Sequence, residues 1–203
     1  MNNSNLLTKL LASIGTFSIL INILLSGYIA SFVKGKITKN DFTISQSLAF
    51  GLKPTLIIFF IIGIVLIGLL VYFRNIKGGD KNKIQMAISY ILLLLITVFF
   101  ITIIWITIYR NETQHYIFSS IIFGSAILFI LLNSYSLWTG IKEKKLYKKI
   151  IILLVPILTM LSLIGLMVGL HFFVNNKAVE VFPSFENIIL ILTGTSILTL
   201  GFF

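Results

Sequence analysis

The stretch from Pro54 to Phe73, PTLIIFFIIGIVLIGLLVYF, decides the fold because it runs for 20 residues without a charged side chain. A helix rises about 1.5 Å per residue, so this length matches the hydrocarbon core of a bilayer, about 30 Å thick. Backbone groups in lipid must find hydrogen-bond partners within their own segment, which favours a helix over an isolated strand. The stretch therefore predicts a membrane-spanning helix.

Five further runs of the same kind lie along the 203 residues, at 10–33, 84–109, 116–141, 150–174 and 185–203. Of the 22 charged residues (16 basic and 6 acidic), only Glu186 falls inside a run. The connections are short, so consecutive helices must run antiparallel. We predict one all-α domain over residues 1–203, a polytopic membrane protein folded as an up-and-down bundle of six transmembrane helices.

Composition agrees with this class. The chain is 58% hydrophobic and 11% charged, whereas soluble domains carry about 25% charged residues. Its net charge of +10 comes from lysines and arginines that flank the apolar runs, where they meet lipid headgroups. We therefore expect membrane lipids as partners, and no nucleic acid. The chain has no cysteine, which excludes disulfides and thiolate metal sites.

The basic residues also indicate an orientation. Ten lie in the N-terminal segment, the second connection and the fourth connection, and six lie in the other three connections. Positive residues are retained in the cytoplasm, so we expect both termini on the cytoplasmic side of the cell membrane. The flanks of the first run favour the opposite orientation, because Lys9 precedes it whereas Lys34, Lys36 and Lys39 follow it.

No Asp, Glu, Lys or Arg lies deep in any run, although proton-coupled carriers and voltage sensors normally need one. The chain also has no His-Glu-x-x-His motif, no Gly-x-Ser-x-Gly elbow and no phosphate-binding glycine loop. We predict no enzymatic activity and no cofactor. Among the uncharged polar residues, Asn22 and Asn133 stand out because an unpaired amide in lipid is costly. Hydrogen bonds between helices explain both, and the alternative is a path for a neutral solute that also includes residues 193–196.

A polar cluster is predicted at the outer side. His115 opens the fourth run, His171 lies near the end of the fifth, and Glu112 and Glu186 lie in or near the adjoining connections. Imidazoles and carboxylates can bind zinc or sense pH. Their spacing matches no metal motif, however, and histidines at this depth commonly face headgroups. We therefore predict no metal site.

Small residues indicate where helices approach closely. Ser162, Gly165 and Gly169 share one face of the fifth run, and Ser120 and Gly124 are spaced in the same way in the fourth. Small residues four apart let two helix backbones come close together. We expect contacts within the chain, and the alternative is a homodimer through the Gly165 face.

Three features resemble the DRAM-type membrane proteins and related six-span proteins of prokaryotes. They are the segment Phe42-Thr43-Ile44-Ser45 before the second run, His115 at the start of the fourth run, and Glu186 at the start of the last. The chain lacks the Pro-Glu pair that follows the loop in DRAM-type members, which favours kinship with the prokaryotic relatives. The resemblance implies a six-helix bundle with cytoplasmic termini and a non-enzymatic role in membrane or lipid organisation.

Two functions follow from these observations. The first is a non-catalytic integral membrane protein that associates with lipid, with a membrane-protein partner or with a second copy of itself. In this case the basic connection at 142–149 either attracts anionic lipid or only sets the topology. The alternative is a small transporter or channel for a neutral solute.

Overall fold

The structure, a computed structural model, describes residues 3–32, 53–75, 79–105, 112–139, 146–174 and 182–202. All of them are helical, as the sequence predicts. The six helices are α1 (Asn3–Phe32), α3 (Lys53–Asn75), α4 (Gly79–Trp105), α5 (Glu112–Thr139), α6 (Leu146–Val174) and α7 (Phe182–Phe202). The all-α class is therefore confirmed, and each helix overlaps one of the predicted runs.

The helix ends differ from the predicted ends by a few residues. Helix α1 begins at Asn3 rather than at residue 10, and α4 begins at Gly79 rather than at 84. The reason is that a charged residue such as Lys9 or Lys83 marks the edge of the apolar region, but it does not stop a helix. Pro54 and Pro183 each stand second in their helix, where a missing backbone N–H breaks no intrahelical bond.

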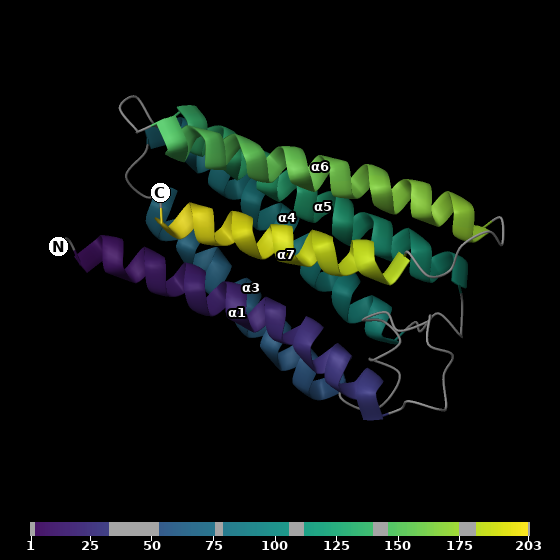
Figure 1. Cartoon of the computed structure of the whole chain (residues 1–203). Coiled ribbons are helices and arrows are strands. Elements are labelled where there is room, and N and C mark those ends of the chain that lie inside the picture. Colours follow the sequence, from purple (N-terminus) through teal and green to yellow (C-terminus); the bar gives the residue numbers. More distant parts are fainter. Residues whose placement is uncertain are drawn as a thin grey trace.

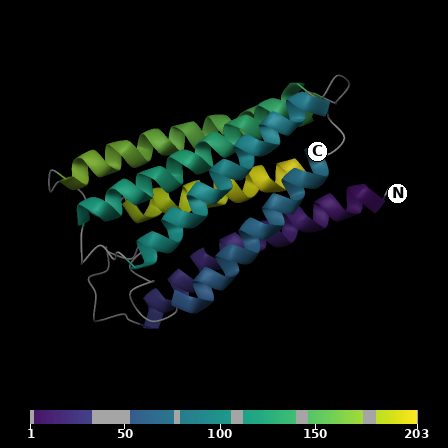
Figure 2. The ribbon, with the colours of Figure 1, turned by 180° about the vertical axis from the view of Figure 1, so that it is seen from behind.

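The helices are arranged as a closed ring of antiparallel neighbours. Each helix packs against the next one along the chain, and α7 closes the ring by packing between α6 and α1. Helix α7 also contacts α5 and α3 across the bundle. Figures 1 and 2 show that α1 begins and α7 ends at the same end of the bundle, which we call the terminal end. The opposite end is called the distal end.

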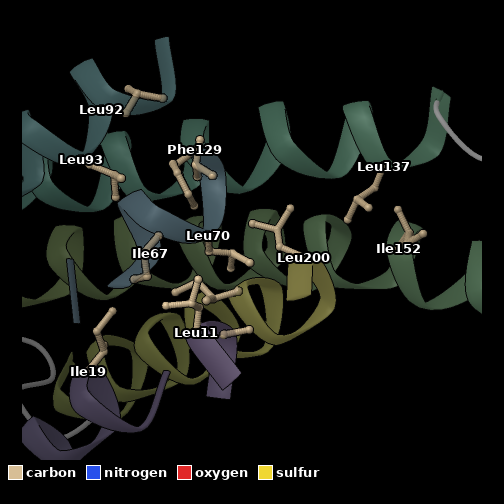
Figure 3. Packing of buried hydrophobic residues seen from close by; sticks show 13 residues of the cluster. Leu11, Ile19, Ile67, Leu70, Leu92, Leu93, Phe129, Leu137, Ile152 and Leu200 are labelled. Carbon is tan, nitrogen blue, oxygen red and sulfur yellow. The ribbon is translucent and has the colours of Figure 1, made fainter. Parts of the chain in front are cut away.

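One hydrophobic cluster draws buried side chains from all six helices. Figure 3 shows Leu11 of α1, Leu70 of α3 and Leu200 of α7 at its centre. Two smaller clusters join α3, α4 and α5, and in one of them the Phe60 ring stacks on Phe100 with 3.7 Å between centroids. The tertiary fold therefore depends on apolar packing along the whole bundle.

The outward faces of the helices are apolar too. Within the described residues, three segments are long and apolar enough to cross a membrane: Thr55–Asn75, Lys83–Ile104 and Ile117–Trp138. Shorter apolar stretches occupy Leu6–Asn22, Lys149–Leu158 and Ile191–Phe202. By length and composition, the chain therefore has helices suited to a bilayer.

Candidate functional site

A buried polar group joins α4 to α5. The Asn133 side chain is 1% exposed, and its Nδ2 donates to the Phe129 carbonyl at 2.8 Å and to the Ser89 hydroxyl at 3.3 Å. Its Oδ1 accepts from Gln85 Nε2 at 3.5 Å. Gln85 and Ser89 are four residues apart, so they share one face of α4. Asn133 thus has interhelical partners, which supports the structural interpretation of this residue.

Asn22 has a different environment. It is 3% exposed, and its Nδ2 donates to two carbonyls of its own helix, those of Ser18 at 3.3 Å and Ile19 at 3.2 Å. Its Oδ1 is buried and has no hydrogen-bond partner among the described residues. Within the part of the chain that the structure describes, the amide of Asn22 is therefore only half satisfied and makes no bond to another helix.

The two asparagines do not form one site. Asn22 lies in the distal half of α1, whereas Asn133 lies near the terminal end of α5, and α1 and α5 are not a packed pair. In the segment at 193–196, Thr195 donates to the Ile191 carbonyl of its own helix at 2.9 Å. The side chains predicted to line a neutral-solute path are thus distributed over separate interfaces.

Two further threonines of the apolar helices bond within their own helix. Thr97 donates to the Leu93 carbonyl at 2.8 Å and Thr102 donates to the Val98 carbonyl at 2.7 Å. Thr16 differs because its hydroxyl reaches another helix, where it donates to the Gly194 carbonyl at 3.2 Å. This bond lies at the tightest interface in the described structure.

That interface joins α1 to α7 through small residues. A Cβ added to Gly194 would lie 2.9 Å from Thr16 Cγ2, and one added to Gly201 would overlap the Ala12 Cβ and lie 2.8 Å from the Thr8 carbonyl oxygen. On another face of α1, Gly15 lies close to Gly63 of α3. A Cβ added to Gly63 would lie 3.3 Å from the Gly15 carbonyl oxygen. The spacing of Thr8, Ala12 and Thr16, four residues apart, was the sequence signal for this contact.

The small residues predicted to mediate packing lie elsewhere. A Cβ added to Gly124 would meet no heavy atom within 4 Å, and Ser120 is exposed, so these two residues make no close backbone approach in the described structure. Their spacing shows that they share a face of α5, but it does not show that this face meets another helix. The side chain of Ser162 and the surroundings of Gly165 and Gly169, in α6, lie outside the described residues.

Four predicted residues lie on helix segments at the distal end. Glu112 and His115 are in the first turn of α5, Glu186 is near the start of α7, and His171 is in the last turn of α6. Their side chains lie outside the described residues. Among the side chains that the structure describes, no group of three histidines or acidic residues could hold a metal ion.

At the terminal end, two basic side chains from different helices contact the last turn of α7. Arg74 Nη1, from the last turn of α3, donates to the Leu200 carbonyl. Lys9 Nζ, from α1, lies 5.6 Å from the centroid of the Phe202 ring, within the range of a cation–π interaction. The Arg74 bond satisfies one of the last carbonyls of the helix, which have no intrahelical donor, and the Lys9 contact is with the ring alone.

Comparison with known proteins adds no further identification. No family model, no curated protein and no solved structure matches the chain.

Proposed function

We propose that this protein is an integral membrane protein that crosses the bilayer six times and associates with membrane lipid without catalysing a reaction. The observation that carries the proposal is the exposed apolar surface of the bundle. Large side chains such as Val65 of α3, Leu94 of α4 and Leu161 of α6 are more than half exposed. Contiguous apolar surface of this kind is rare on soluble monomers and is typical of lipid-facing helices.

The packing supports six crossings rather than three. Helix α1 packs along α3, α6 packs against α5, and α7 contacts both α3 and α5. Each of these neighbours contains a segment that is long and apolar enough to span a bilayer. The shortest of the six helices, α7, has 21 residues, which correspond to about 31 Å. A helix of bilayer length that packs alongside a membrane-spanning helix lies in the same bilayer.

The terminal end is proposed to face the cytoplasm. Lys9, Arg74, Lys83 and Lys149 all lie on helix segments at that end. Because the positive-inside rule counts basic residues close to the ends of spans, the ten basic residues on this side outweigh the six on the other. Both ends of the described bundle, at α1 and α7, would then be cytoplasmic.

Kinship with the six-span relatives of DRAM-type proteins is part of the proposal. It is supported by the three sequence features already given, of which His115 lies in the first turn of α5 and Glu186 lies near the start of α7. The segment containing Phe42 to Ser45 lies outside the described residues. This kinship favours a role in membrane or lipid organisation, with a second copy or another membrane protein as a further partner.

Cysteine labelling tests the topology directly, because the wild-type chain has no cysteine and gives no background. In intact cells, a membrane-impermeant maleimide is expected to label Asn111→Cys and Lys177→Cys, in the connections at the distal end. Lys77→Cys and Gly140→Cys, in connections at the terminal end, should be labelled only after the membrane is permeabilised. Labelling of all four in intact cells, or extraction of the chain from membranes by alkaline carbonate, would contradict six crossings.

A further inference from the structure

The last turn of α7 is contacted by cations from two other helices. Arg74 of α3 binds the Leu200 carbonyl, and Lys9 of α1 lies over the Phe202 ring. Both basic side chains are half-buried, so they are fixed at the junction of three helix ends. We call the group formed by Lys9, Arg74 and the last turn of α7 the terminal basic site.

The terminal basic site carries more positive charge than its described surroundings balance. The C-terminus of a helix is equivalent to about half a negative charge, whereas Lys9 and Arg74 contribute two full positive charges. A guanidinium has five N–H donors and an ammonium has three. The Leu200 carbonyl accepts one bond from Arg74, and the contact of Lys9 with an aromatic ring is electrostatic. The charge of the site and its number of hydrogen-bond donors therefore suit an additional anion.

The surroundings of the site distinguish one kind of anion from another. Exposed apolar and aromatic side chains lie near each cation in the sequence and in the last turn of α7. They are Leu6 and Leu10 of α1, Tyr72 and Phe73 of α3, and Phe202 of α7. A small soluble anion would make no favourable contact with these apolar side chains. An anionic lipid can place its charged headgroup on the cations and its acyl chains along the apolar side chains.

We propose that the terminal basic site binds the phosphate of an anionic lipid headgroup, with the acyl chains directed along the outer faces of α1 and α3. The proposal rests on the proposed membrane topology, which places this end at the level of the cytoplasmic headgroups. The planar fork of Arg74 matches phosphate oxygens, and Lys9 adds a second charge from the neighbouring helix. Basic pockets between helices on the cytoplasmic side are the expected location for such a headgroup.

The experiment reconstitutes the full chain in phosphatidylcholine nanodiscs that contain graded fractions of phosphatidylglycerol. The thermal midpoint and the number of lipids retained in native mass spectrometry are measured. We expect phosphatidylglycerol to raise the midpoint of the wild type, and Lys9→Gln and Arg74→Gln each to weaken the apparent affinity about fivefold. Lys149→Gln removes the same charge from α6 at the same end, and it should weaken the affinity less than about twofold.

Three further arms separate the alternatives. Arg74→Lys keeps the charge and loses the fork, so its affinity should fall between that of the wild type and that of Arg74→Gln. The midpoint in pure phosphatidylcholine reports any loss of folding when Arg74 no longer binds Leu200, and Lys9→Gln leaves that hydrogen bond in place. Inorganic phosphate added to the detergent-solubilised chain tests for a free anion, and it should raise the midpoint much less than the lipid does.

Several outcomes would contradict the proposed lipid site. Equal losses in all three Gln variants would mean a diffuse attraction, and unchanged affinity in Lys9→Gln and Arg74→Gln would mean that the headgroup binds elsewhere. Stabilisation by inorganic phosphate equal to that by lipid would replace the headgroup with a soluble anion. None of these results alters the cysteine-labelling pattern, so failure of the lipid site is distinguishable from failure of the proposed topology.

Discussion

Replacing Gly201 with leucine is expected to separate α1 from α7 and to lower the thermal midpoint of the purified protein by about 10 °C, the shift for a loss of about 3 kcal/mol. Even a Cβ at this position would overlap the Ala12 Cβ and lie 2.8 Å from the Thr8 carbonyl oxygen. The oxygen belongs to the backbone of α1, which can yield only if the whole helix moves. Helix α7 closes the ring of helices, so the loss should spread beyond this one contact.

Gly124→Leu is the matched control, because it adds the same side chain to another helix of the bundle. A Cβ at Gly124 would meet no heavy atom within 4 Å. We expect the thermal midpoint to change by less than about 2 °C, as for a substitution on an open surface. If Gly124→Leu were the more damaging of the two, a partner chain would have to cover that face of α5, and the assignment of the closest contact to α1 and α7 would be wrong.

The second large effect is expected from a comparison of the two buried asparagines. Asn133→Leu would leave Gln85 and Ser89 without the partner that they share, and it should destabilise the bundle by about 1–2 kcal/mol. Asn22→Leu would remove an amide whose oxygen has no described partner and whose nitrogen bonds only to its own helix. Its expected effect is between neutral and slightly stabilising, because apolar burial replaces an unsatisfied polar atom.

Reversible unfolding in mixed micelles measures both variants against the wild type. Adding Ser89→Ala to each variant completes a double-mutant cycle, in which Ser89 should couple to Asn133 and show no coupling to Asn22. A larger loss for Asn22→Leu than for Asn133→Leu would contradict this prediction. It would mean that the Asn22 Oδ1 accepts a hydrogen bond from a group that the described residues do not include, and a bound neutral solute is one such group.

The position of each helix was predictable from the sequence because it depends on local properties. The run at 54–73 became α3, Lys53–Asn75, and the run at 150–174 became α6, Leu146–Val174. Hydrophobic length and the demand for internal backbone hydrogen bonds act within one segment. The costly burial of an amide is also a local property, which is why Asn22 and Asn133 could be singled out before their partners were known.

The partners themselves were not predictable in the same way. Ser120 and Gly124 have the small-residue spacing of a close contact, yet a Cβ at Gly124 would meet no heavy atom within 4 Å, and the closest approach described is that of Gly201 to Ala12. Arg74 was expected only to orient the second connection, whereas it binds the end of α7 across the bundle. Each of these contacts depends on how two helices are rotated and aligned, and in a chain rich in Leu and Ile many faces are equally apolar.

The sequence alone thus determined that this chain forms six apolar helices with its charges at their ends, because a bilayer-length helix requires only residues that are contiguous in the chain. The tertiary structure decided which faces meet, which asparagine is satisfied, and that Lys9 and Arg74 converge on α7. Those outcomes arise from side-chain shape and helix register between segments as far apart as Thr16 and Gly194. The physical difference is that hydrophobicity is a property of each residue, whereas complementarity is a property of pairs.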